Sequence, residues 1–336
     1  MAREARSQVH KRRQGCITGC LTRILLLLGL CALLFVGACV LGLVRNDPVT
    51  GAPSLSLDGL LSEGLPALPE LSLPEIGALQ SLTLPAWAYG VQTGGLTVKT
   101  LRAGEGEAVL VCCDGYTMLL GGGSGMGVSL AAQLLLCGVN RLDVAAALSS
   151  EQQQIGGLPL VMRLMPPDYL LFQDSQVKGT AYNRLIQTAQ RSGGVQMIVP
   201  QQGLTFSLGR STVTVVGPAR TAHTDGRDDG LSLRVDYGQT SVLIAGSITS
   251  AGERELITSG VRLNADVLIC AQGGGTDATC AEFVAAVSPA YALMTAKEPP
   301  NSVKVRLQRA GAQVYTAGEY GVMTVTSDGY TLRVDP

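Results

Sequence analysis

The sequence has 336 residues and a net charge of −1, with 15% charged residues, 46% hydrophobic residues and 42 glycines. The first 45 residues hold seven bases and one acid, so the remainder has 18 basic and 25 acidic residues, a net charge of −7. This negative net charge argues against direct nucleic-acid binding, because such binding depends on neutralising phosphates. The net charge does not exclude a local basic patch on the surface. Only His10 and His223 supply imidazole, the side chain most used as a general base and transition-metal ligand.

The first predicted element is a membrane helix over residues 24–44. Ile24 to Val44 carry no charge, and 21 residues at about 1.5 Å each span the roughly 30 Å hydrocarbon core of a bilayer. The run is longer than the apolar part of a cleaved signal peptide. Basic residues precede it, which places residues 1–23 in the cytoplasm as a basic tail. We therefore expect a retained, single-pass signal anchor in the cell membrane, with the main domain extracytoplasmic.

Residues 45–95 are predicted to be a stalk or linker rich in proline and leucine. Six prolines between Pro48 and Pro85 interrupt the segment at intervals that prevent long helices. We expect a semi-extended spacer, whose leucines could also pack on the domain or on a partner.

Residues 96–336 alternate between strand and helix patterns, which predicts one domain. The expected strands are Leu96–Ala103, Ala108–Cys113, Thr117–Leu120, Leu142–Leu148, Tyr169–Phe172, Val195–Val199, Leu204–Leu208, Thr212–Val216, Leu231–Tyr237, Ser241–Ala245, Val267–Cys270, Tyr291–Thr295, Gln313–Thr316, Val322–Thr326 and Thr331–Val334. The expected helices are Val128–Cys137, Leu158–Leu164, Thr180–Gln190, Ala251–Ser259, Ala278–Val287 and Ser302–Ala310. This interleaving predicts an α/β fold in which two mixed sheets lie between helices.

The nine cysteines form no metal-binding signature. We expect most of them to be buried, because free cysteine behaves as a small hydrophobic residue. Cys112 and Cys113 are adjacent and should point to opposite faces of one strand. A disulfide from either of them to Cys137 is left open.

The loop after the predicted strand Leu142–Leu148 has the position of an active site. The strand opens into six polar residues, Ser149 to Gln154, before a turn at residues 155–157 and a helix. In α/β folds the chemistry usually lies where strands end in this way. The loop offers one carboxylate, Glu151, among amides and hydroxyls, and it has no histidine. It therefore has the shape of a site without the usual chemistry.

Several segments spread over residues 96–336 carry a resemblance to a known family. They are Leu101–Ala108, Leu119–Gly123, Leu148–Gly157, Asp229–Gly238, Ala245–Ser247, Gln272–Gly275, Glu298–Asn301, Gly311–Tyr315 and Gly321–Gly329. In order and spacing they resemble the hydrolase-like domain of ComEC-type competence proteins of bacterial DNA uptake, which has the metallo-β-lactamase fold. The resemblance implies a metallo-β-lactamase-like αββα sandwich. In the family, imidazoles and carboxylates hold one or two metal ions for hydrolysis.

The chain departs from that family at the metal ligands. The family's ligand positions fall on Ser149, Glu151, Gln153, Gln154, Ser247, Gln272 or Gly273, and Pro299. Neutral amides and hydroxyls bind Zn²⁺ or Mn²⁺ weakly compared with imidazole, carboxylate or thiolate. We therefore expect no metal, no cofactor and no catalytic residue. The residues predicted to line a degenerate cleft that binds a ligand are Ser149, Glu151, Gln153, Gln154, Ser247 and Gln272.

Other groups of residues have simpler interpretations. The glycine-rich stretch Gly121–Gly127 resembles a phosphate-binding loop, but we expect a flexible turn at the rim of the site. We expect His223 to be a solvated loop histidine and Cys270 to be a core thiol with no base to activate it. The charged runs Arg227–Asp229 and Glu253–Glu255 are interpreted as solvated turns and a helix face.

These observations predict a membrane-anchored pseudoenzyme that acts in binding or assembly, with a possible protein partner on the stalk or cleft. The ligand and the pathway stay unidentified. One alternative is a ComEC-like metal-dependent hydrolase or nuclease that uses non-standard ligands and is linked to DNA uptake. A third possibility is a scaffold beside a competence-type channel that does not cut DNA.

Overall fold

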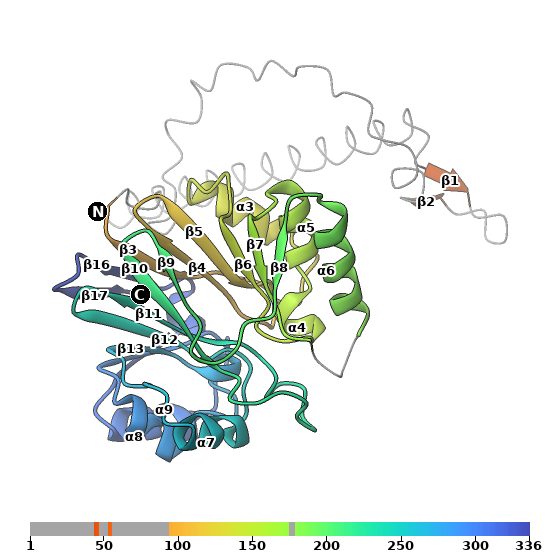
Figure 1. Cartoon of the computed structure of the whole chain (residues 1–336). Helices are drawn as coiled ribbons and strands as arrows, with labels where there is room; N and C mark the ends of the chain where they lie inside the picture. The colour runs from red at the N-terminus through yellow and green to blue at the C-terminus, as the bar shows by residue number, and fades with distance from the viewer. Residues whose placement is uncertain (1–43, 47–52, 56–93, 175–178) are drawn as a thin grey trace, which may run out of the picture. The chain divides into compact units, whose positions relative to one another are not determined.

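The computed structural model describes residues 44–46, 53–55, 94–174 and 179–336 (Figure 1). Residues 24–43 of the predicted membrane helix and most of the predicted stalk lie outside the described residues. Among the described residues, no helix has both the length and the apolar character needed to cross a membrane. The chain divides into two units, Met1–Ser81 and Leu82–Pro336. In the first unit the described residues form one antiparallel pair, β1 (Val44–Asn46) and β2 (Pro53–Leu55).

The second unit contains an eight-stranded mixed sheet. Its strands, in spatial order, are β17 (Leu332–Asp335), β16 (Thr324–Ser327), β3 (Leu96–Thr100), β4 (Ala108–Cys113), β5 (Tyr116–Gly121), β6 (Val144–Ala146), β7 (Tyr169–Leu171) and β8 (Gln196–Ile198). Strands β17 to β5 pair antiparallel, and β5 to β8 pair in parallel.

A seven-stranded mixed sheet repeats this plan. Its strands, in spatial order, are β15 (Gln313–Thr316), β14 (Tyr291–Met294), β13 (Val267–Ile269), β12 (Thr240–Ile244), β11 (Ser232–Tyr237), β10 (Ser211–Gly217) and β9 (Thr205–Leu208). Strands β9 to β12 are antiparallel, and β12 to β15 are parallel. Each sheet thus joins an antiparallel half to a parallel half that needs helical crossovers.

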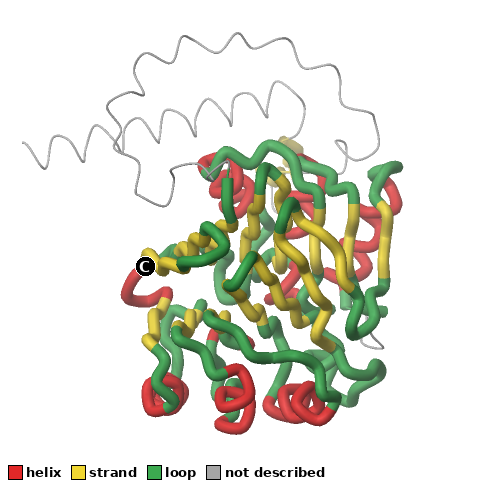
Figure 2. The backbone as a smooth tube through the Cα atoms, turned by 60° about the vertical axis from the view of Figure 1, so that its left-hand side comes forward, coloured by secondary structure: helices red, strands yellow, loops and turns green. Residues whose placement is uncertain are grey.

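Helices cover the outer face of each sheet (Figures 1 and 2). The eight-stranded sheet carries α3 (Val128–Leu136), α5 (Leu158–Leu164) and α6 (Thr180–Arg191), whereas the other carries α7 (Ser250–Thr258), α8 (Ala281–Val287) and α9 (Asn301–Arg309). A third core lies between the sheets. The structure therefore confirms the predicted α/β sandwich of two mixed sheets between helices.

Strand β4 shows why the prediction worked. Val109 and Val111 belong to the core between the sheets, and Leu110 belongs to the core beneath the helices. Because side chains alternate along a strand, a strand buried on both faces is apolar throughout. The same alternation places Cys112 and Cys113 in different cores, as predicted. The five cysteines in the described residues are buried and form no disulfide, so the disulfide to Cys137 that was left open is not present.

Parallel strands bring the loops of both sheets to one end of the domain. The carbonyl oxygen of Leu148, just after β6, accepts from the Leu231 N–H at 3.1 Å and from the Ser247 hydroxyl at 3.0 Å. Leu231 precedes β11 and Ser247 follows β12, so Leu148 joins loops of the two sheets. This end contains the predicted cleft.

Candidate functional site

The predicted site loop is a turn followed by a short helix, α4 (Gln152–Ile155). The backbone carbonyl of Gln154 accepts from the Gly122 N–H at 2.6 Å. The buried side chain of Gln154 accepts from the Glu107 N–H at 3.3 Å through Oε1. The hydroxyl of Ser149, also buried, accepts from the Glu151 N–H at 3.1 Å. Ser149 and Gln154 therefore serve the structure of the loop.

The glycines around this loop are required by the close approach of backbones. A methyl group on Gly106 would overlap the carbonyl of Gln153. A methyl group on Gly127, which has φ +91°, would overlap the carbonyl of Gly157. The predicted flexible turn at residues 121–127 is thus a closely packed segment, and neither glycine accepts a side chain without displacement of the backbone.

Ser247 and Gln272 follow β12 and β13 of the seven-stranded sheet. The Ser247 hydroxyl contacts the carbonyl of Arg227 at 3.1 Å in addition to that of Leu148. The Gln272 amide donates to the Ile248 carbonyl at 3.1 Å, and its Oε1 accepts from Arg227 Nη1 at 3.0 Å. Both residues are therefore joined to a segment that the family resemblance did not mark.

Arg227 is the centre of this arrangement. Its guanidinium makes a two-pronged contact with Asp225, at 3.0 Å from Nε and 2.7 Å from Nη2. Its Nη1 contacts Asp277 at 2.6 Å as well as Gln272. Desolvation raises the pKa of Glu151, the Arg227 charge opposes that rise, and Asp225 and Asp277 add to it. The guanidinium thus lies among the carboxylates and the amide of the candidate cleft.

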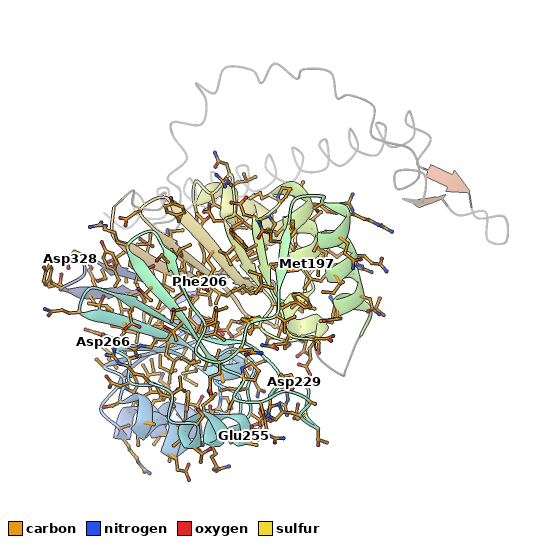
Figure 3. The ribbon with its side chains drawn as sticks, viewed as in Figure 1. Met197, Phe206, Asp229, Glu255, Asp266 and Asp328 are labelled. Carbon is orange, nitrogen blue, oxygen red and sulfur yellow. The ribbon has the colours of Figure 1, made fainter. Side chains whose placement is uncertain are left out.

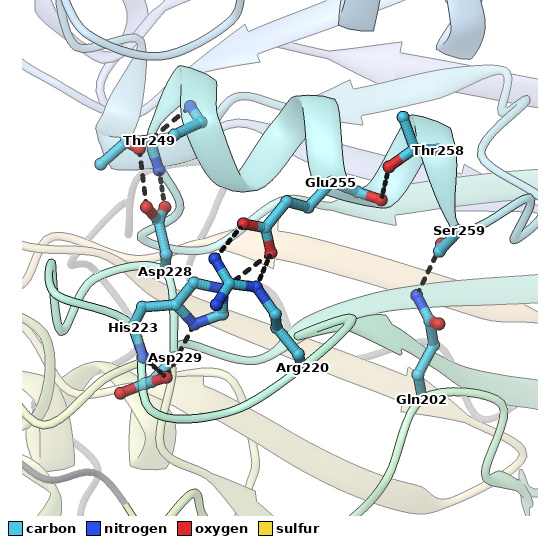
Figure 4. A network of polar contacts seen from close by, with 10 residues as sticks. Gln202, Arg220, His223, Asp228, Asp229, Thr249, Glu255, Thr258 and Ser259 are labelled. Atoms are coloured by element: carbon cyan, nitrogen blue, oxygen red, sulfur yellow. Dashed lines mark hydrogen bonds and ion pairs between the residues drawn. The ribbon is translucent and has the colours of Figure 1, made fainter.

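Arg227 belongs to residues 218–231, between β10 and β11, which we call the strap. Asp228 accepts from the Thr249 N–H at 2.7 Å and from its hydroxyl at 2.9 Å. His223 contacts Asp229 through Nδ1 and Glu255 of α7 through Nε2, both at 2.8 Å (Figure 4). Figure 3 labels Asp229 and Glu255 within the domain. These contacts fasten the strap to the loop after β12 and to α7.

Four charged or polar residues predicted to be solvated are in fact buried. The side chain of His223 is 5% exposed, because two carboxylates enclose its ring. Asp228 and Asp229 are buried because each accepts backbone N–H groups. Glu253 is fully buried and accepts from the N–H groups of residues 279 and 280, ahead of α8. The interpretation as solvated groups is wrong for these four residues, whereas Arg254 is exposed and Arg227 and Glu255 are partly exposed.

A second buried acid, Glu107, immediately precedes β4. Neither of its carboxyl oxygens has a hydrogen-bond partner among the described residues, and the residue is 1% exposed. Burial raises its pKa to about 8, so it is largely protonated at neutral pH. Burial also raises the pKa of the Cys270 thiol, with Glu107 and Glu253 contributing, as expected for a core thiol.

The candidate positions fit a metal ion poorly. Ser247 and Gln154 already use oxygen atoms in contacts within the chain, and Gln272 binds Arg227. Arg227 places a permanent positive charge among these groups, which opposes a metal cation nearby. In the part of the chain that the structure describes, no group of three or more His, Cys, Asp or Glu side chains is arranged to hold a metal.

The structure brings Glu151, Ser247 and Gln272 around Arg227, whereas Ser149 and Gln154 are buried within their loop. Gln153 is exposed, and its side chain forms no hydrogen bond with the described residues. Sequence reasoning missed the residues Arg227, Asp225, Asp277 and Glu107. The charged run before Gly230 was the available signal for the strap.

The position aligned with the last family histidine lies in a different place. Pro299 lines a hollow of about 340 Å³ with residues of the β14–α9 loop and of the segment after β15. Another hollow, of about 490 Å³, lies between α8 and α9. Neither hollow is lined by a candidate cleft residue.

No protein-family model matches the sequence, and no curated protein matches it. Among solved structures, the metallo-β-lactamase fold protein YhfI from Bacillus subtilis has a TM-score of 0.45 and 14% identity, over 66% of this chain and 96% of that one. A metallo hydrolase from the archaeon Ignicoccus hospitalis has a TM-score of 0.43 and 15% identity, over 71% and 99%. CmlA, a diiron β-hydroxylase from Streptomyces venezuelae, has a TM-score of 0.43 and 15% identity, over 67% of this chain and only 53% of that enzyme.

Likenesses at these scores carry no argument about activity, ligand or partner. The layers and strand order described above make the protein an α/β sandwich of two mixed sheets between helices.

Proposed function

We propose that this protein is a catalytically degenerate relative of ComEC-type hydrolase domains that acts in binding or assembly. In this proposal, the uncharged run at residues 24–44 anchors it in the membrane, and the domain of residues 96–336 works at the outer face. In the candidate cleft, a protein side chain takes the place of the metal ion.

The observation that carries the proposal is the position of Arg227. In the aligned family, positive charge at this end of the fold comes from metal ions, whereas here a guanidinium lies 2.6–3.0 Å from Asp277, Asp225 and Gln272. Asp225 and Asp277 pair with this guanidinium, so its charge needs no added counter-ion. A guanidinium cannot lower the pKa of a bound water as a Lewis-acidic metal does, so the cleft lacks the means to generate a hydroxide nucleophile.

The exposed part of the same loop offers a surface for a partner. Glu151, Gln152 and Gln153 are exposed, whereas the residues that follow them are buried. Amides both donate and accept hydrogen bonds, so this edge suits recognition of a polar chain segment. The closely packed glycines beneath residues 151–153 hold this edge rigid. Because the edge is already ordered, less entropy is lost when a partner binds.

Elemental analysis of the purified protein tests the loss of metal chemistry. The proposal predicts no stoichiometric Zn or Mn and no phosphodiesterase activity when either ion is added. Stoichiometric metal that is lost in a Glu151→Ala variant would instead establish the alternative, a ComEC-like hydrolase with non-standard ligands. A Glu282→Ala variant, which removes an exposed carboxylate on α8, is the matched control.

Site-directed crosslinking in native membranes tests the binding half of the proposal. A photo-crosslinking residue replaces Gln153 in one variant and Tyr330, which is 78% exposed and far from the cleft in sequence, in another. The proposal predicts a discrete protein adduct from position 153 and none of the same mass from position 330. Identical adducts from both positions, or none from position 153, would contradict it.

A further inference from the structure

The strap is held against α7 by a histidine that contacts two carboxylates. His223 Nδ1 lies 2.8 Å from Asp229 Oδ1, and Nε2 lies 2.8 Å from Glu255 Oε2. Figure 4 shows the ring in contact with both carboxylates, and Arg220 in contact with the same carboxylate of Glu255. The His223 side chain is 5% exposed, so water does not readily replace either contact.

This geometry requires both ring nitrogens to carry a proton. An ionised carboxylate only accepts hydrogen bonds, and a neutral imidazole has one N–H and one lone pair. The Arg220 and His223 contacts lower the pKa of Glu255, so Glu255 is ionised and Nε2 donates to it. Asp229 Oδ1 already accepts from the His223 backbone N–H at 3.0 Å, so it also acts as an acceptor. A neutral ring would place a lone pair against one of the two oxygens.

The surrounding charges favour the protonated ring. Asp229 and Asp225 face it from the strap, and Glu255 faces it from α7. Two cations lie beside these carboxylates: Arg220 pairs with Glu255 at 2.6 Å, and Arg227 pairs with Asp225 at 2.7 Å. Burial acts to lower the pKa of His223, but the hydrogen bonds to Glu255 and Asp229 outweigh it, so the pKa is raised from 6.5.

We propose that His223, Asp229 and Glu255 form a pH-sensitive latch, which holds the strap closed when His223 is protonated and releases it at alkaline pH. The latch would control access to the candidate cleft, so its purpose rests on the proposed function. Loss of the ring proton leaves a lone pair facing a carboxylate oxygen in a site shielded from water. One of the two contacts must then open.

Release of the strap would uncover the cleft. The strap supplies the Arg227 carbonyl that Ser247 binds and the guanidinium that Gln272 binds. Gly230 of the strap packs so closely on Leu148 and Ser247 that a methyl group there would overlap both. Movement of the strap would therefore free the side chains of Ser247 and Gln272 for a partner.

The sign of the pH dependence follows from the raised pKa. Because protonated His223 is favoured in the folded protein, its contribution is fully present below pH 6.5. It is lost as the pH rises through the folded-state pKa. The latch thus weakens with rising pH, opposite to a contact that depends on ionising a carboxylate.

Hydrogen exchange of the full-length protein tests the latch, with rates corrected for the intrinsic dependence on pH. We expect exchange in residues 218–231 to rise about tenfold between pH 6 and pH 9 through local opening of the strap. A proton NMR titration should place the His223 midpoint above 6.5, with its signal identified by a His10→Gln variant.

Glu255→Gln is the decisive variant. Its new amide N–H can donate to the lone pair of a neutral ring, so the His223 midpoint should fall and exchange in the strap should become independent of pH. Glu282→Gln, on exposed α8, should keep the wild-type response. A flat exchange profile in the wild type, a His223 midpoint at or below 6.5, or an unchanged rise in Glu255→Gln would overturn the latch. No ligand or metal enters this experiment, so its failure is distinguishable from failure of the proposed function.

Discussion

Replacement of Glu107 by glutamine should stabilise the protein, and the gain should grow with pH. Glu107 is 1% exposed, and both carboxyl oxygens lack partners among the described residues. Its pKa rises from 4.5 to about 8 because burial penalises the charged form. The folded state therefore keeps a proton that the unfolded state releases, so the free energy of unfolding falls with pH across that interval.

The expected magnitude follows from the pKa values. One pH unit corresponds to about 1.4 kcal/mol for a group protonated in one state and ionised in the other. Between pH 5 and pH 7 the wild type should therefore lose about 3 kcal/mol through Glu107. Glu107→Gln is neutral in both states and has no such loss. The two proteins should have similar stability near pH 4.5, and the variant should be more stable at pH 7.

Urea unfolding at pH 5, 6, 7 and 8, followed by far-ultraviolet circular dichroism, measures this difference. Glu253, whose pKa burial raises to about 7, adds a loss of the same sign in both proteins. Subtracting the two proteins at each pH therefore isolates Glu107. A stability difference that does not change with pH would refute the assignment of a buried, protonated Glu107.

Three further substitutions test the contacts around the strap and the core. Gly230→Ala should cost about 1–3 kcal/mol of unfolding free energy, since its methyl overlaps the loop after β6, and thermal unfolding measures this. Asp228→Asn should cost a similar amount, about 1–3 kcal/mol, because an amide N–H would then face a donor of Thr249, and urea unfolding measures it. Arg210→Met should lower stability at pH 6, and the effect should shrink as the pH falls below 3.8, because Arg210 holds the pKa of Asp114 well below its ordinary value. Acid titrations of both proteins by circular dichroism give this comparison.

Apolar elements were predictable because the local pattern of apolar residues indicates which side chains are buried. Strand β4 and helix α5 have the bounds that alternation and helical spacing predict. Helix α4 was missed because its four residues, three of them glutamine, have no apolar periodicity. The family resemblance, and no local pattern, singled out Ser149, Ser247 and Gln272 as members of one candidate site.

The chemistry within the cleft was less accessible to sequence reasoning. Arg227 and Asp277 are 50 positions apart, and nothing local indicates that their side chains meet at 2.6 Å. Glu253 was predicted to lie on a solvated face because charged side chains are usually exposed. In the structure its buried carboxyl group accepts hydrogen bonds from backbone N–H groups ahead of α8. His223 was misjudged because one of its two carboxylate partners, Glu255, lies 32 positions away on α7. Such tertiary partners decide which charges are buried.

A crystal structure of the protein grown with Zn²⁺ or Mn²⁺ tests the central claim most directly. Anomalous scattering at the metal edge locates any bound ion without reference to the interpretation of the side chains. Our account predicts the Arg227 guanidinium in contact with Asp225, Asp277 and Gln272, and no anomalous peak in the cleft. A strong peak bound by Glu151, with Arg227 displaced, would contradict it.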